Sequence, residues 1–158
     1  MENISAKERF LKESYIPLLQ QIPLNAQAVF GKMNVLQMME HMAEYLGMAY
    51  GNPPQQDSIK NPEIIAKTRQ FLFSEQAFKP NTPNALMPDT PAPSRFNDKE
   101  AALLAVQQAL DAFFDFFSKN PDALIQSPFF GMLNFHQSIQ LLYKHSRHHL
   151  VQFNALND

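Results

Sequence analysis

The sequence predicts an all-α protein, and two observations support this fold class. Eight of the twelve prolines lie between Pro53 and Pro93, whereas residues 97–119 and 134–155 contain none, so proline separates helical segments from their connections. No stretch alternates apolar and polar residues for long enough to indicate a sheet. Four long amphipathic helices with a long connection in the middle are typical of a helix bundle with a crossover.

The first two long helices are predicted from their ends. The first covers about 5–21 and stops before Pro23. Asn34 can cap the second, and Gln37 stands at the third helical position, where its side chain can complete a capping box. The run Gly-Asn-Pro-Pro at 51–54 ends this helix.

The crossover and the two remaining long helices follow. A short helix is expected at 61–73, with asparagine as its cap and proline in its first turn. Residues 78–96 are interpreted as an extended surface loop, either a cover over one end of the bundle or a plain connection. The third long helix is predicted over about 97–118 with its cap at Asn97, and the fourth over about 134–155 with a second capping box.

Length and composition indicate a single domain that spans 1–158. Hydrophobic residues make up 45% and charged residues 18% of the chain, and no window approaches the run of ~18 apolar residues that a membrane helix needs. Residues 1–10 include acidic side chains where a signal peptide would carry a basic start and an apolar run. We therefore expect a soluble, cytoplasmic protein without a membrane partner.

Cysteine content and net charge limit the chemistry. The chain has no cysteine, so disulfides and thiol nucleophiles are excluded, and any metal must be held by nitrogen and oxygen ligands. The net charge is −2 and no basic stripe is present, so nucleic acid is not an expected partner.

Three of the five histidines are predicted to point inward. On the helix over 134–155, His145 and His149 are about 40° apart and lie within the apolar arc. His41 lies on the apolar face of the helix that Asn34 caps. An i, i+4 pair together with a third imidazole is an arrangement that can bind one ion. Burial of an imidazole without a partner costs roughly 1–3 kcal/mol, and a shared cation would offset that cost for all three rings.

Simpler interpretations compete with the metal site. A lone inward histidine is more often a hydrogen-bonded core residue than a ligand. His136 and His148 fall on or beside the polar face, together with Lys144 and Gln140, and are predicted to be solvated. Five methionines between 33 and 48 are interpreted as flexible core filling rather than as copper(I) ligands.

Two blocks of sequence resemble a known family. GKMNVLQMMEHMAEYLG at 31–47 and SPFFGMLNFHQSIQLLYKHSRHHLVQF at 127–153 resemble the DinB/YfiT-like superfamily, within it a branch known mainly as a domain of unknown function. In that branch the chain closes with HPFFG and, further on, YKH-x-x-HHL-x-QF. The chain departs from the pattern at three positions, which are Ser127, Ser138 and Asn154.

The resemblance implies a four-helix bundle of up-down-down-up topology with a divalent metal between its second and fourth helices. Residue by residue, the ligands would be His41, His145 and His149. Zinc is the first expectation for the metal, with nickel, iron or manganese as alternatives. Similar members of the superfamily include thiol-dependent transferases and proteins regarded as hydrolases. The expected function is therefore a metal-dependent enzyme that activates water or a low-molecular-weight thiol toward a small-molecule substrate.

Four polar side chains flank these histidines and are candidates for orienting them or for lining a pocket: Gln37, Glu44, Tyr45 and Gln152. Gln37 and Glu44 could orient His41, and Gln152 could orient His149 or contact a ligand. Tyr45 could place its hydroxyl in the pocket.

The alternative from another class is a non-catalytic bundle that binds a small ligand or a partner, with a structural metal or none. A paired-carboxylate di-iron bundle is disfavoured, because Glu-x-x-His is required on inward faces and Met38, Leu142 and Ser146 stand three positions before the histidines. A homodimer is also expected to be possible, since many such bundles pair through helix faces.

Overall fold

The computed structural model describes residues 3–82, 88 and 90–157, and the chain is mostly helical with one small sheet. The elements in chain order are α1 (Ile4–Arg9), η1 (Phe10–Ser14), α2 (Tyr15–Gln21), α3 (Val35–Met48), α4 (Pro62–Phe73), α5 (Lys99–Lys119), β1 (Ile125–Ser127), β2 (Gly131–Leu133) and α6 (Phe135–Gln152). The mostly helical prediction is therefore confirmed.

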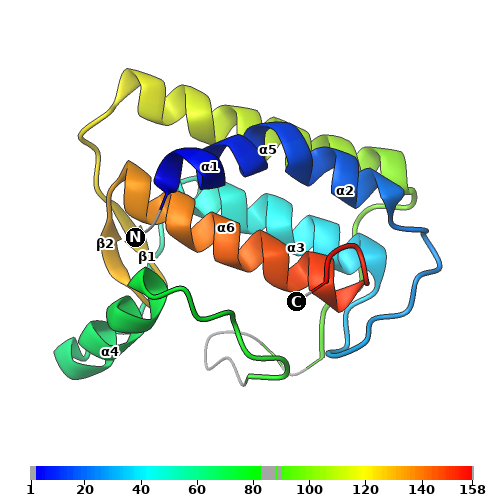
Figure 1. The fold of residues 1–158 in the computed structure, drawn as a ribbon, viewed down its shortest axis with the longest axis horizontal. Coiled ribbons are helices and arrows are strands. Elements are labelled where there is room, and N and C mark those ends of the chain that lie inside the picture. The colour runs from blue at the N-terminus through cyan, green and yellow to red at the C-terminus, as the bar shows by residue number, and fades with distance from the viewer. Residues whose placement is uncertain (1–2, 83–87, 89, 158) are drawn as a thin grey trace.

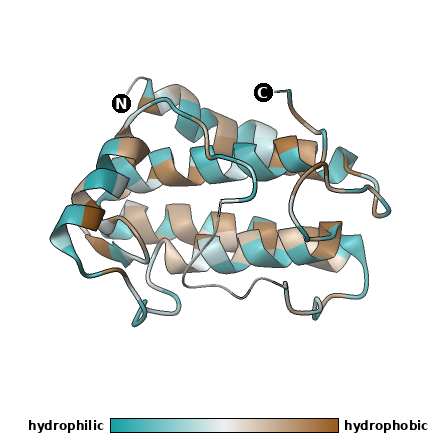
Figure 2. Ribbon diagram, turned by 90° about the horizontal axis from the view of Figure 1, so that it is seen from below, coloured by the Kyte–Doolittle hydropathy of each residue, from teal (hydrophilic) through white to brown (hydrophobic). Residues whose placement is uncertain are grey.

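The long helical segments lie side by side, and α4 projects at one end beside the hairpin (Figure 1). The helix α3 packs against α5, and α1 packs against α6. Apolar and polar residues alternate along these helices, as the brown and teal bands of Figure 2 show. Their apolar sides meet in one core. Three of the five methionines between 33 and 48 are fully buried in it, in agreement with the core interpretation, and its fully buried members include Tyr15, Met38, Met39, Met42, Leu46 and Phe113.

The first helical segment contains a turn of π-helix that the sequence prediction lacks. Instead of a continuous α-helix over 5–21, the chain forms α1, η1 and α2 in succession. The backbone N–H of Tyr15 donates to the carbonyl of Phe10, five residues earlier. Pro17 has no N–H to donate, so the carbonyl of Glu13 loses its usual α-helical partner. This gap accounts for the change of helical spacing immediately before α2.

Local caps explain where the later helices begin. Asn34 and Asn134 each accept from the backbone N–H three residues on and form complete capping boxes, as predicted. Asn61 caps α4 ahead of the proline, also as predicted. The prediction for α5 was wrong by one residue, because Asp98 rather than Asn97 accepts from the N–H of Ala101.

The hairpin of β1 and β2 corrects the purely α-helical expectation. The strands pair antiparallel from Ile125 opposite Leu133 to Ser127 opposite Gly131. Three residues per strand are too few for a period of two to be recognised. The guanidinium of Arg69 on α4 donates to the carbonyls of Phe130 and Met132 and fastens the hairpin to the short helix.

Two residues predicted for the polar face of α6 are instead buried. Gln140 is fully buried and Lys144 is only 7% exposed. The end of α4 covers them, and the Lys144 ammonium donates to the carbonyls of Phe71, Leu72 and Ser74 at 2.8, 3.4 and 3.1 Å. The Gln140 amide donates to the carbonyls of Leu72 and Ser74. Backbone acceptors at a helix end thus satisfy two polar groups that burial would otherwise penalise.

The crossover after α4 contains no helix or strand in its described residues between 78 and 96, as predicted; residues 83–87 and 89 lie outside the described part. Its last residues lie along α3, where the amide of Gln37 donates to the carbonyl of Ala92 and Arg95 pairs with Glu40 and Glu44. Among the described residues, no helix has the length and apolar character that crossing a bilayer requires.

Candidate metal centre

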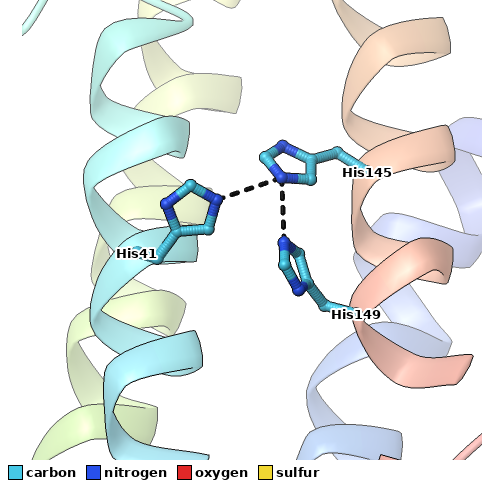
Figure 3. A group of neighbouring side chains, drawn as sticks. All are labelled: His41, His145 and His149. Atoms are coloured by element: carbon cyan, nitrogen blue, oxygen red, sulfur yellow. Dashed lines mark hydrogen bonds between the residues drawn. The ribbon is translucent and has the colours of Figure 1, made fainter. Parts of the chain in front are cut away.

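Three histidine rings meet between α3 and α6. His41 lies midway along α3, and His145 and His149 lie one turn apart on α6, so their side chains project from the same helix face. The three rings point toward one another (Figure 3). Nε2 of His145 lies 3.1 Å from Nε2 of His41 and 3.0 Å from Nε2 of His149. The ligand atoms of all three lie within 4.8 Å of one another, and the group could hold a metal ion.

Two of the three distances between these nitrogens suit a shared cation. Zinc binds imidazole nitrogen at about 2.0–2.1 Å, so two nitrogens on one ion are about 3.3 Å apart in tetrahedral and about 3.0 Å apart in octahedral coordination. The two separations from His145 Nε2, 3.0 and 3.1 Å, fall in this range. The donor set is also chemically suitable, because imidazole is a good ligand for zinc, nickel and iron.

Hydrogen bonding between the rings cannot satisfy this arrangement. In a neutral imidazole each nitrogen carries either one proton or one lone pair, so Nε2 of His145 can form one linear hydrogen bond but faces two nitrogens. Nδ1 of His145 is also buried and has no hydrogen-bond partner among the described residues. A cation that accepts one lone pair from each ring would satisfy Nε2 of His145 together with the two nitrogens that it faces. The residues present therefore fit a divalent ion.

Burial keeps the rings neutral, which is the form that binds metal. Desolvation, helped by nearby His148, lowers the pKa of His41 from 6.5 to about 4. Burial first, and the neighbouring imidazoles second, lower the pKa values of His145 and His149 well below the ordinary value. At neutral pH the lone pairs are thus available without the prior loss of a proton.

Two aromatic side chains, Tyr45 and Phe78, pack against the histidines. The ring of Tyr45 meets His145 edge-on with 4.2 Å between centroids, and burial raises the pKa of its phenol. Phe78, from the start of the crossover, lies 5.8 Å from His145 and 5.9 Å from His148. These apolar rings lower the local dielectric around the three nitrogens and strengthen their interaction with any charge between them.

A small cavity lies on the far side of Tyr45. Residues of α3, the hairpin and α6 line it, among them Met48, Ile125, Ser138 and Leu141. It holds about 20 Å³, which is room for about one water molecule. Ser138 is one of the three departures from the family pattern, and it lines this cavity rather than touching the histidines.

The structure separates the four flanking candidates. Gln152 is buried, and its Oε1 lies 2.8 Å from Nδ1 of His149. Tyr45 packs on the imidazoles. Gln37 and Glu44 have other partners, since Gln37 completes the cap of α3 and Glu44 pairs with Arg95. The helical period indicated that both side chains lie beside His41, but it could not show that a helix cap and the crossover would engage them.

Two further neighbours were missed or misplaced in the sequence analysis. His148 was expected in solvent but is partly buried, with its ring 5.0 Å from Phe30 and 5.1 Å from His149. His136 is exposed, as predicted. Phe78 was assigned only to a surface loop, because no periodic pattern in that segment indicates which side chain turns inward.

Comparisons with known proteins return nothing that bears on this centre. No protein-family model, no curated protein and no solved structure matches the chain. Membership of the DinB/YfiT-like superfamily therefore stays a prediction, and the candidate centre is defined by its own geometry, three imidazoles on two helices that could hold one metal ion.

Proposed function

We propose that this protein is a metal-dependent enzyme with a three-histidine divalent-metal site formed by His41, His145 and His149. The observation that carries the proposal is the meeting of three Nε2 atoms in a neutral cluster, with His145 and His149 buried and His41 partly buried, that hydrogen bonds alone cannot satisfy. Zinc is the favoured metal, with nickel, iron or manganese as alternatives.

Three protein ligands leave at least one coordination position open, which is typical of catalytic rather than structural sites. When bound, the ion would supply Lewis-acid activation of a water or of a thiol, as in a hydrolase or a thiol transferase. The chain's own part is to hold the three rings in position and to keep them unprotonated. Tyr45 and Phe78 limit the access of bulk water to the cluster from their sides.

The proposal also covers the setting of the reaction. The substrate would be a small molecule, with a low-molecular-weight thiol as the second substrate in the transferase version. We retain the up-down-down-up bundle as a single domain, the cytoplasmic location and the homodimer as parts of this proposal. The side-by-side packing of the long helical segments supports the first of these.

Metal content tests the proposal directly. Protein purified without an affinity tag should contain or take up about one equivalent of metal, whereas His145→Ala should lose it because one of three ligands is gone. His136→Ala is the matched control, since His136 is exposed on the same helix. Elemental analysis and titration with Zn²⁺ provide the measurement. Equal metal stoichiometry in the wild type and His145→Ala, or no metal in either, would reject the site.

The alternative function is a non-catalytic bundle that binds a small ligand or a partner, with a structural ion or none. The small volume of the cavity beside Tyr45 favours the version that binds a partner, because about 20 Å³ is far below the size of a usual ligand pocket. Removal of the metal separates the two functions, since a structural ion contributes directly to folding and a catalytic one need not.

A further inference from the structure

The side-chain amide of Gln152 has only one favourable orientation. Its Nε2 lies 3.0 Å from the carbonyl oxygen of Phe30 and donates to it. The opposite orientation would place Oε1 against that carbonyl, so two acceptors would face each other. The backbone of Gln152 is held by the same segment, because its carbonyl accepts from the N–H of Val29 at 2.9 Å. The segment before α3 thus holds both the backbone and the side-chain amide of Gln152.

This orientation determines the proton on His149. With Nε2 of Gln152 bound to Phe30, Oε1 is the atom that faces Nδ1 of His149, 2.8 Å away. An amide oxygen only accepts, so Nδ1 must carry the proton and Nε2 must carry the lone pair. Nε2 is the atom that lies 3.0 Å from Nε2 of His145. The lone pair is therefore directed at the shared point before any ion arrives.

Gly31 allows Gln152 to reach this position. A Cβ on residue 31 would lie 2.8 Å from Nε2 of Gln152, closer than nonbonded atoms normally approach. The backbone of Gly31 also has φ +76°, a conformation that side chains disfavour. A residue larger than glycine would push the amide away from Phe30 and loosen its hold on the imidazole.

We propose that Gln152 is a positioning residue that selects the metal-binding tautomer of His149, and that Phe30 and Gly31 hold its amide in the orientation this requires. The role rests on the metal site proposed above. It makes a separate claim about the protein without metal, namely that the proton of His149 is already on Nδ1.

The first test measures that proton in metal-free, ¹⁵N-labelled protein. Long-range ¹H–¹⁵N spectra distinguish the two neutral tautomers, and His149→Gln identifies the signals of His149. The wild type should show the Nδ1–H form. Gln152→Met removes the acceptor at similar volume, and should populate the Nε2–H form and weaken Zn²⁺ binding about 10- to 100-fold. Gln152→Glu keeps an acceptor for Nδ1 of His149 although it can no longer donate to the carbonyl of Phe30, and it should keep the Nδ1–H form.

Gln140→Met is the control for the loss of a buried amide. Gln140 is fully buried on the same helix and also donates to backbone carbonyls, but these carbonyls belong to Leu72 at the end of α4 and to Ser74 just after it. This variant should leave the tautomer and the Zn²⁺ affinity unchanged. If Gln152→Met retained the Nδ1–H form, or if Gln140→Met weakened Zn²⁺ binding equally, the role of Gln152 would be overturned.

The second test addresses Gly31. Gly31→Ala should shift the His149 tautomer and weaken Zn²⁺ binding in the same direction as Gln152→Met. Gly51→Ala is the matched control, because Gly51 has a similar φ of +82° but its added Cβ would meet only the Ile125 side chain at 3.7 Å. Equal effects of the two alanines on the tautomer would reject the contact with Gln152. If the wild type bound no metal but showed the Nδ1–H form, the proposed function alone would fail.

Discussion

At the scale of single residues, burial holds three imidazoles in their neutral form, and acid is therefore expected to oppose folding. The pKa of His41 is lowered from 6.5 to about 4, and burial and the neighbouring imidazoles also lower the pKa values of His145 and His149 well below the ordinary value. In the unfolded chain all three would titrate near 6.5. Below that pH the unfolded state binds more protons than the folded state. Protonation therefore lowers the free energy of the unfolded state relative to the folded one, and the free energy of unfolding decreases.

The stability of metal-free protein should decrease as the pH falls from about 6.5 to 4, and should be nearly independent of these rings above 6.5. Urea unfolding at a series of pH values, after chelation, gives the measurement. His41→Gln should flatten the dependence, while His136→Gln, at an exposed site, should leave its slope unchanged. A constant stability across this range in the wild type would contradict buried neutral rings.

Helical geometry accounts for the part of the site that could be predicted. The spacing of His145 and His149 and the apolar arc beside His41 require only the helical period, and the three rings do meet. Gln37 and Glu44 lay on suitable faces, but their hydrogen bonds go to a helix cap and to Arg95. The partner that each of these side chains binds depends on segments distant in the sequence, and the helical period carries no information about them.

At the scale of helices and strands, short polar signals placed most boundaries. Asn34 and Asn134 were identified because each is followed by glutamine three residues on, and both capping boxes exist. The start of α5 was misplaced because two capping residues, Asn97 and Asp98, stand next to each other, and it is the side chain of Asp98 that accepts from the N–H three residues on. The hairpin was missed because its strands are three residues long.

The cap of α5 provides a test at this scale. Asp98→Ala should destabilise the protein by about 1 kcal/mol, because it removes the acceptor of the Ala101 N–H and a negative charge at the helix N-terminus. Asn97→Ala should change stability by less than about 0.5 kcal/mol. Denaturant unfolding of both variants makes the comparison. A larger loss of stability for Asn97→Ala than for Asp98→Ala would support Asn97 as the cap, as the sequence predicted.

At the scale of the whole molecule, we expect the packing of the helices not to depend on the histidines. The main core joins α3 and α5 through buried apolar side chains and includes none of the three ligands. Metal would therefore stabilise the fold only by mass action, by about 4 kcal/mol when its concentration is 1,000 times the dissociation constant.

Chelation should leave the helices in place. Protein treated with a chelator should keep near-native helicity by circular dichroism, should melt at a lower temperature and should recover when Zn²⁺ is added. The same treatment applied to His145→Ala should have no effect, which controls for the chelator itself. Collapse of helicity in the wild type would favour a structural ion and the non-catalytic alternative.

The buried ammonium of Lys144 has a consequence for how this chain can change over time. Its three carbonyl partners, at Phe71, Leu72 and Ser74, all belong to the end of α4 and the residues after it. A shorter descendant that lost the end of α4 and the residues after it would expose the cation and the Gln140 amide, and water would then replace their carbonyl acceptors. Such a deletion would convert a buried polar patch of α6 into a solvated one.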